Sequence, residues 1–394
     1  MRRISILKGI VIITIAILLG VSIVSFTAEN KMGTGDFTFV QLSDTHWGFN
    51  NEKINPDFAG TLKKAVDEVN TLATRPDFIM FTGDLTQTTD DPKIRRQRMS
   101  EFKDIIRNLK VANVHFIPGE HDASLDNGKA FKEFFGKTYY TFDYKGVHFI
   151  ALDNVSDPEG KIGDVQLKWL GKVLTKFKKN SRIIVFSHRP LFPLNPAWDW
   201  WTVDGDKAIA LLKPYTNVSV LYGHIHQINH FNSDQIKFDS AQGLMYPLPV
   251  SGSVPKKAPI PWDASSPYKG LGFRTIEVKE AQSDLMITEY SITASQTGEN
   301  VQSPVVIKVT AKRFEYSPSV IKVKKGVPAV IEFTSLDVTH GFRCPGLGLT
   351  ARIDPGKPTR VSFTPERAGT FDFACNIFCG EGHSDMTGMI IVEE

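Results

Sequence analysis

Five short polar motifs occur in a fixed order along the sequence, and each follows an apolar stretch that is typical of a buried strand. The motifs are SDTH from Ser43, GDLT from Gly83, GEHD from Gly119, SHRP from Ser187 and GHIH from Gly223. Amphipathic helical patterns, such as residues 55–72, lie between several of these stretches. Alternating strands and helices with polar residues at the strand ends predict a layered α/β sandwich.

The residue types in these motifs indicate a metal centre. Residues two apart in a strand point the same way, so Asp44 and His46 can face one ion, and His224 and His226 can face the same cavity. Asp84 can then lie between two ions. Carboxylates mixed with imidazoles suit Zn, Mn or Fe, and a pair of such ions can bind a phosphate and share a hydroxide.

The ordered set resembles the motifs of the calcineurin-like metallophosphoesterases, over Asp36 to Ile292. The resemblance implies a four-layer sandwich, a bridging hydroxide as nucleophile and two divalent ions, Mn, Fe or Zn. One ion would be held by Asp44, His46, Asp84 and His226, and the other by Asp84, Glu120, His188 and His224. His121 would be the general acid that protonates the leaving oxygen, with Asp122 orienting it.

Glu120 departs from the family pattern, which has Asn at this position. We expect its carboxylate still to bind a metal; the alternative is that it points away and leaves one metal site weak. An added negative charge beside two divalent ions weakens the attraction for a phosphate dianion, which would favour diesters or less charged substrates. Gln87 stands where the purple acid phosphatase branch has a tyrosine, so no ferric tyrosinate is expected.

Residues 304–394 have a different texture, with short alternating strands separated by Pro and Gly, which predicts an all-β sandwich. Near its end, CNIFCGEGHSDM places two of the three cysteines four residues apart and adds His383 and Met386. Thiolate, imidazole and thioether ligands suit copper, and His340 can supply a further imidazole. A single blue-copper centre needs one cysteine, so Cys375 is surplus, and two thiolates that bridge two copper ions explain it.

This segment resembles the CuA domain of cytochrome c oxidase subunit II, which is shared with nitrous oxide reductase. The resemblance rests on HGF at His340, the IDPGK turn and the cysteine–histidine–methionine loop. It implies a cupredoxin-like sandwich and electron transfer, with copper ligands His340, Cys375, the carbonyl of Ile377, Cys379, His383 and Met386. A single blue-copper site and a Cys375–Cys379 disulfide are the alternatives, and Cys344 is expected to be a buried thiol.

The N-terminus places Arg2, Arg3 and Lys8 around the start of an apolar run from Gly9 to Phe26. Residues 1–30 are therefore predicted to be a signal peptide or a membrane anchor, and the poor cleavage site favours the anchor. The rest of the chain is then expected on the outer face of the membrane or in the periplasm. The formal net charge of +3 gives no reason to expect a nucleic acid partner.

Two smaller features have competing interpretations. The segment NPAWDWW, residues 195–201, can form a wall of a substrate pocket or pack against the core. His115 and His148 lie in apolar strands and are expected to be structural, and His230 is expected at the surface.

The sequence therefore predicts a leader at 1–30, a metallophosphoesterase domain at 36–292, a polar linker at 293–303 and a CuA-like domain at 304–394. The predicted function is extracytoplasmic phosphoester hydrolysis, combined with a copper electron-transfer module that exchanges electrons with a partner such as a c-type cytochrome. The alternative is a copper redox protein whose phosphoesterase-like domain binds metal but has little hydrolase activity. Hydrolysis transfers no electrons, so the two sites predict two separate chemistries.

Overall fold

The computed structural model of the chain describes residues 34–293, 305–327, 329–365 and 367–394. The predicted leader lies outside these residues, and so does the predicted linker apart from residue 293. Among the helices in the described ranges, none is both long enough and apolar enough to span a bilayer.

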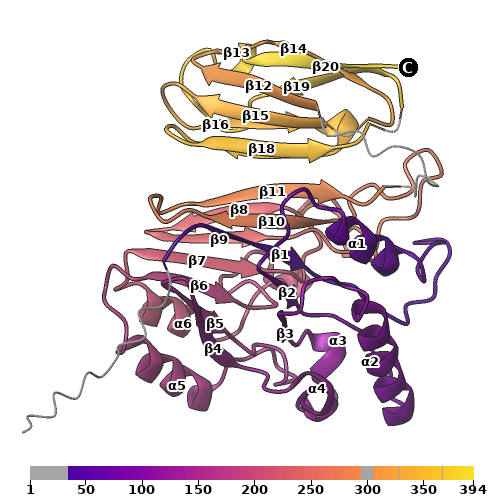
Figure 1. The fold of residues 1–394 in the computed structure, drawn as a ribbon, viewed down its shortest axis with the longest axis vertical. Coiled ribbons are helices and arrows are strands. Elements are labelled where there is room, and N and C mark those ends of the chain that lie inside the picture. Colours follow the sequence, from indigo (N-terminus) through magenta and orange to yellow (C-terminus); the bar gives the residue numbers. More distant parts are fainter. Residues whose placement is uncertain (1–33, 294–304, 328, 366) are drawn as a thin grey trace, which may run out of the picture. The chain divides into compact units, whose positions relative to one another are not determined.

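Two β-sheets form the centre of residues 37–291 (Figure 1). The first contains β1 (Phe37–Leu42), β2 (Phe78–Thr82), β3 (Val114–Ile117), β10 (Gly272–Val278) and β11 (Leu285–Ser291), in the order β11-β10-β1-β2-β3. The second contains β4 (Tyr140–Tyr144), β5 (Val147–Ala151), β6 (Arg182–Phe186), β7 (Asn217–Tyr222), β8 (Asn229–Ser233) and β9 (Ile236–Ser240), in the order β4-β5-β6-β7-β9-β8. Strands β1, β2 and β3 are parallel to one another, and so are β5, β6 and β7, so the carboxyl ends within each set share one edge of the sheet.

Three apolar clusters join these sheets and the helices into four layers. Between the sheets, the rings of Phe39 and Phe78 stack with centroids 4.7 Å apart, and Phe149 packs edge-on against both. The opposite face of the first sheet is covered by α1 (Thr61–Asn70), α2 (Pro92–Ile106) and α4 (Lys129–Phe135). The opposite face of the second sheet is covered by α5 (Asp164–Leu174) and α6 (Gly205–Leu212). The predicted four-layer sandwich is confirmed.

Local sequence explains these elements. Strand β2 reads FIMFT and is buried at every position, because a parallel strand that is covered on both faces needs a continuous apolar run. Helix α1 buries the predicted apolar stripe, Leu62, Ala65, Val66 and Val69. It begins later than predicted, because the side-chain amide of Asn55 donates to Met245 and Thr61 and thereby fixes residues 55–60 as a loop.

The strands between residues 305 and 393 lie in two sheets (Figure 1). One contains β12 (Val305–Lys312), β13 (Glu315–Ser317), β15 (Ala329–Ser335) and β18 (Pro358–Phe363), in the order β13-β12-β15-β18. The other contains β14 (Val320–Lys324), β16 (His340–Cys344), β17 (Leu349–Ile353), β19 (Gly369–Ala374) and β20 (Thr387–Glu393), in the order β14-β20-β19-β16-β17. Phe342 lies at the centre of the shared core, with its ring centroid 4.6 Å from that of Phe333 and 5.1 Å from that of Phe373. The predicted all-β sandwich is confirmed.

Four short helical turns complete the described elements. They are α3 (Glu120–Ala123), η1 (Pro196–Trp198), η2 (Pro345–Leu347) and η3 (His383–Asp385). Two of them begin at residues predicted to bind metals, Glu120 and His383.

Replacing Phe39 with Ala should destabilise the four-layer region by about 3–5 kcal/mol, because the stacked rings between the sheets leave little room for collapse. Chemical denaturation followed by fluorescence measures the loss. Leu125→Ala is the control, since this side chain is 50% exposed and should change stability by about 0.5 kcal/mol or less. Equal losses in the two variants would contradict the assignment of the inter-sheet core.

Candidate metal centres

The predicted ligands of the first centre follow β1, β2, β3, β6 and β7. All lie in loops except Glu120, which begins α3. Five adopt left-handed backbone conformations, with φ of 54° at Asp44, 40° at His46, 49° at Asp84, 65° at His224 and 52° at His226. For residues other than glycine this conformation is strained, and it persists where the surrounding structure fixes it, commonly at functional sites. Backbone hydrogen bonds fix it here, since the amide of His46 donates to the carbonyl of Asp84 at 2.8 Å.

Asp44 and His46, and likewise His224 and His226, face the cluster because of these left-handed turns and not because of strand alternation. Strands β1 and β7 end before Asp44 and His224, so the alternation expected from a strand does not apply. The left-handed turns direct the side chains toward one another. The amide of His224 donates to both carboxylate oxygens of Asp44 at 3.1 Å, which ties the GHIH loop to the SDTH loop.

The structure brings all seven predicted ligands together in two groups. One group contains Asp44, His46 and His226, and the other contains Asp84, Glu120, His188 and His224; within each group the ligand atoms lie within 4.8 Å of one another. Asp84 also lies within this distance of His46 and His121, so its carboxylate joins the two groups. The binding of two metal ions by these sets remains a prediction.

Carbonyl oxygens orient the four imidazoles of this cluster. The donors and acceptors are His188 Nδ1 to Thr82 O (2.7 Å), His226 Nδ1 to Tyr246 O (2.6 Å), His224 Nε2 to Asp199 O (2.9 Å) and His46 Nδ1 to Gln87 Oε1 (3.1 Å). A carbonyl oxygen can only accept, so each of these nitrogens carries hydrogen and the other ring nitrogen faces the cluster. This is the arrangement that imidazole ligands of a metal require, and together with the carboxylates it fits divalent Zn, Mn or Fe.

Glu120 points into the cluster. Its Oε1 lies 2.8 Å from Nδ1 of His224, and its Oε2 lies 2.9 Å from Nε2 of His188. Neither this Oε2 nor this Nε2 is in hydrogen-bond geometry with a partner within the described residues, so both atoms fit the ligands of a cation. The absence of a side chain at Gly119 lets the carboxylate of Asp84 pack against this loop, because a Cβ there would lie 2.0 Å from that carboxylate.

Arg189 lies beside Glu120, which the sequence did not predict. Its Nε is 3.6 Å from Oε2 of Glu120, and its Nη1 donates to the carboxylate of Asp199 at 2.8 Å. Asp199 belongs to residues 195–201, whose Trp198 and Trp200 are buried in the core. For these two tryptophans the packing interpretation is confirmed, whereas Asp199 contributes to the site.

Burial and neighbouring charges set the protonation of the ligands. Burial lowers the pKa of His46, and it lowers the pKa of His226 to about 4, which leaves both rings neutral near pH 7. Burial raises the pKa of Asp44 to about 7. Burial also acts to raise the pKa of Glu120, but His224, His188 and Arg189 together hold it well below its usual range.

Thr88 contacts His121, the predicted general acid. The Oγ1 of Thr88 lies 2.6 Å from Nδ1 of His121, and the Thr88 amide donates to the same nitrogen at 3.3 Å. The Nε2 of His121 faces the cluster, 3.9 Å from Oδ2 of Asp84. The ring is therefore placed with Nε2 toward Asp84 and Nδ1 on Thr88.

The prediction that Asp122 orients His121 is wrong in this structure. The buried carboxylate of Asp122 instead accepts from the amides of Leu85 (2.9 Å), Thr86 (2.8 Å) and Gly119 (3.0 Å). Buried backbone donors need acceptors, and the GDLT loop has these amides to satisfy. Asp122 thus shapes the loop that presents Asp84.

The remaining histidines lie outside the cluster, as expected. His115 stacks on Phe142 with centroids 4.0 Å apart, and His148 stacks on Phe177 at 3.8 Å. His230 is partly exposed and pairs with Asp239.

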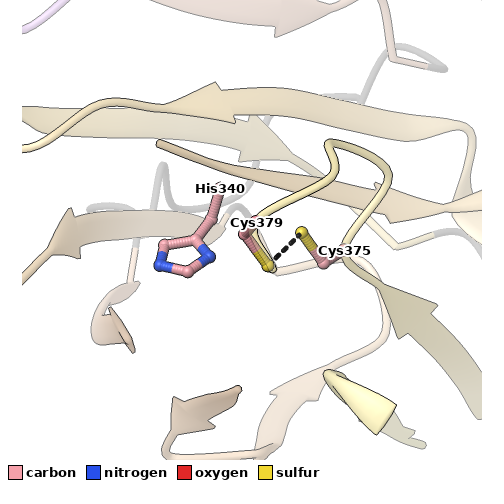
Figure 2. A group of neighbouring side chains, drawn as sticks. All are labelled: His340, Cys375 and Cys379. Atoms are coloured by element: carbon pink, nitrogen blue, oxygen red, sulfur yellow. Dashed lines mark hydrogen bonds between the residues drawn. The ribbon is translucent and has the colours of Figure 1, made fainter. Parts of the chain in front are cut away.

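The predicted copper ligands also converge. The sulfurs of Cys375 and Cys379 lie 3.9 Å apart, and the carbonyl of Ile377 lies 3.1 Å from the Cys375 sulfur. The Cys379 sulfur lies 3.7 Å from His383 Nδ1 and 4.0 Å from Met386 Sδ. Figure 2 shows the imidazole of His340 beside the sulfurs of Cys375 and Cys379. The ligand atoms of these three residues lie within 4.8 Å of one another.

The two cysteines of this cluster are free thiols and form no disulfide in the structure. Burial, followed by the neighbouring Cys375, raises the pKa of Cys379 to about 11. Buried, protonated thiols become thiolates when a metal displaces their protons, so the pair fits a cation such as copper. Cys344 is a buried free thiol, which confirms that prediction.

Asp337 orients His340. Its Oδ1 accepts from Nε2 of His340 at 2.7 Å, and the imidazole is fully buried. The other nitrogen, Nδ1, is buried and has no hydrogen-bond partner within the described residues. A histidine held by a carboxylate on one nitrogen and unpaired on the other is typical of a metal ligand.

Comparison with known proteins agrees with this geometry. Residues 37–228 match the family of the calcineurin-like phosphoesterases, and residues 285–392 match the cupredoxin-like domain. The chain combines a calcineurin-like phosphoesterase with a cupredoxin-like domain. It is similar to cytochrome c oxidase subunit 2 of Thermus thermophilus, with 38% identity over 99 residues that cover 25% of this chain and 71% of that protein.

The phosphoesterase region has relatives of its own. A probable glycerophosphodiester phosphodiesterase GpdQ of Arcobacter nitrofigilis is 27% identical over 207 residues, covering 48% of this chain and 72% of that protein. The structure of purple acid phosphatase PPD1 from yellow lupin covers 67% of this chain and 53% of its own, with a TM-score of 0.50 and 14% identity. At this identity the likeness concerns the fold alone.

Replacing Thr88 with Val should lower kcat of the phosphoesterase about tenfold, because His121 loses the hydroxyl on Nδ1 and with it part of its general-acid contribution. Steady-state kinetics and metal analysis check this, and metal content should not change. Thr88→Ser keeps the hydroxyl and should keep the activity. Normal kcat in Thr88→Val, with reduced kcat in His121→Ala, would show that Thr88 has no such role.

Replacing Asp337 with Ala should weaken copper retention by about 10–100-fold, because His340 loses the acceptor that orients it. Competition with a copper chelator measures the affinity. Asp385→Ala removes an exposed carboxylate from the same ligand loop and serves as the control. Equal retention in the two variants would exclude a specific role for Asp337.

Proposed function

We propose that this chain is an extracytoplasmic phosphoesterase that hydrolyses phosphomonoesters or phosphodiesters at a pair of divalent Mn, Fe or Zn ions. The observation that carries the proposal is the position of Asp84. Its carboxylate lies within 4.8 Å of the ligand atoms of Glu120, His188 and His224, and also within 4.8 Å of His46, which belongs to the group with Asp44 and His226. A shared carboxylate between two sets of nitrogen and oxygen ligands is what a two-metal hydrolase needs.

The chain's own residues then have distinct roles. Two bound ions would supply Lewis-acid polarisation of the phosphoester and an activated water. Thr88 contacts Nδ1 of His121, and Nε2 of the same ring faces Asp84. From this position His121 would deliver a proton to the leaving oxygen. Tyr246 packs against His46 and His226, with centroids 5.0 and 4.6 Å away, and would limit access of water on that side.

We further propose that the cupredoxin-like domain binds two copper ions as a CuA-type electron-transfer centre. Two adjacent buried thiols support this over a single blue-copper site, because one copper ion would leave the second thiol without a role. Such a centre exchanges electrons with a redox protein, and a c-type cytochrome is the partner class that we propose. Phe378, between the two cysteines, is 79% exposed and is available for contact with such a partner.

The location rests on the sequence. Arg2, Arg3 and Lys8 flank an apolar run typical of an anchor or export signal, which supports a position outside the cytoplasm. The N-terminal segment is proposed to hold the protein at the membrane.

The protein reconstituted with Mn or Zn should hydrolyse a chromogenic phosphodiester or monoester, and treatment with a chelator should abolish turnover. His188→Ala should lose at least about 100-fold in kcat because a ligand of one ion is removed. Arg182→Met, a change at the opposite end of β6, is the control. Absence of turnover with every metal, in protein that retains copper, would favour a copper redox protein with an inactive phosphoesterase-like domain.

A further inference from the structure

We propose that Arg189 determines substrate charge selectivity, by offsetting the carboxylate of Glu120 so that dianionic phosphomonoesters are accepted. This inference rests on the proposed phosphoesterase function. The sequence alone predicts the opposite preference, because Glu120 adds a negative charge beside the expected metal ions. The structure supplies the missing positive charge.

The pair is close and shielded from water. Nε of Arg189 lies 3.6 Å from Oε2 of Glu120, and both atoms are buried. Neither has a hydrogen-bond partner in the described part of the chain. Because bulk water cannot screen the guanidinium here, its charge acts on the centre more strongly than that of a surface arginine would.

The surrounding residues leave the guanidinium little freedom. Asp199 accepts from its Nη1 at 2.8 Å, and the same residue's backbone carbonyl accepts from Nε2 of His224. Gly160 closes the other side, since a Cβ at this glycine would lie 2.6 Å from Nη1. The backbone carbonyl of Arg189 is bound by the side-chain amide of Asn154 at 2.9 Å. Arg189 is therefore a positioned charge and not a flexible surface group.

The positive charge of Arg189 lies between two carboxylates, Glu120 and Asp199, which are not equally screened by water. The Asp199 side chain is 55% exposed and solvated, so its negative charge is screened by water. The Glu120 side chain is 19% exposed and faces the ligand atoms. Glu120 with Arg189 thus approximates the neutral amide that the family has at position 120. Removal of the guanidinium would make the electrostatic energy of a bound substrate less favourable. The change would be about twice as large for a dianion as for a monoanion, because the Coulomb energy scales with charge.

The experiment measures the ratio of kcat/KM for an aryl phosphomonoester to that for a methyl aryl phosphodiester, in four metal-reconstituted proteins. These are the unchanged protein, Arg189→Met, Glu120→Asn and the double variant. Arg189→Met should lower the ratio about tenfold, Glu120→Asn should raise it, and the double variant should return it close to the original value. Metal content and affinity are measured for each, because Glu120 faces the ligand atoms.

Two further variants separate charge from folding. Arg189→Lys keeps the charge and should keep the ratio, whereas Arg182→Met replaces a partly buried arginine outside the cluster and should leave it unchanged. If Arg189 has a purely structural role, Arg189→Met should lower kcat/KM equally for both substrates, and the double variant should not recover. That result would overturn the inference. If the unchanged protein binds no metal or hydrolyses neither ester, the proposed function itself fails. If it hydrolyses both and Arg189→Met leaves the ratio intact, only this inference fails.

Discussion

Hydrogen bonds between loops hold the first centre together, and its chemistry depends on them. The imidazoles of His46, His188, His224 and His226 each donate one N–H to a carbonyl oxygen of another segment. The acceptors belong to Thr82, Gln87, Asp199 and Tyr246. These bonds select which nitrogen faces the cluster before any cation arrives. The left-handed turns at Asp44, His46, Asp84, His224 and His226 are kept by the same network. The conformational strain of these turns is therefore supported by the four-layer core beneath them.

The same network sets the electrostatics. Three carboxylates, Asp44, Asp84 and Glu120, are gathered among neutral or charged imidazoles in a region with little access to water. Burial of so many acidic groups is unfavourable without compensating cations. The proposed metal ions would supply most of that compensation, and the guanidinium of Arg189 lies 3.6 Å from the carboxylate of Glu120.

The cupredoxin-like domain solves a related problem with softer atoms. Its β-strands place His340 near Cys375 and Cys379, and Asp337 fixes the imidazole in the way that carbonyl oxygens do in the first centre. Oxygen and nitrogen ligands suit hydrolytic metals, whereas paired thiolates suit copper and electron transfer. Both candidate centres thus use residues at the ends of β-strands, with an acceptor behind each oriented imidazole and a second ring nitrogen that could bind the proposed metal.

The sequence by itself determined the fold classes and the residue types of both centres. Apolar runs such as FIMFT predicted buried strands, and the ordered motifs placed Asp84 and His188 at strand ends. The copper ligands Cys375, Cys379, His383 and Met386 could also be predicted from the sequence, because they lie within one short segment. Arg189 and Asp337 lie within three residues of predicted ligands, so a search for charged neighbours could have found them.

Tertiary structure alone decided what lies behind those ligands. Thr88 reaches His121 across 33 residues, and the carbonyl of Asp199 reaches His224 across 25. No local pattern encodes such contacts, because they depend on how separate loops meet at the edges of two sheets. For the same reason the sequence assigned Asp122 to His121, while the fold placed it on the amides of the GDLT loop. Residue type follows from local chemistry, but the partner of a side chain is set by the packing of distant segments.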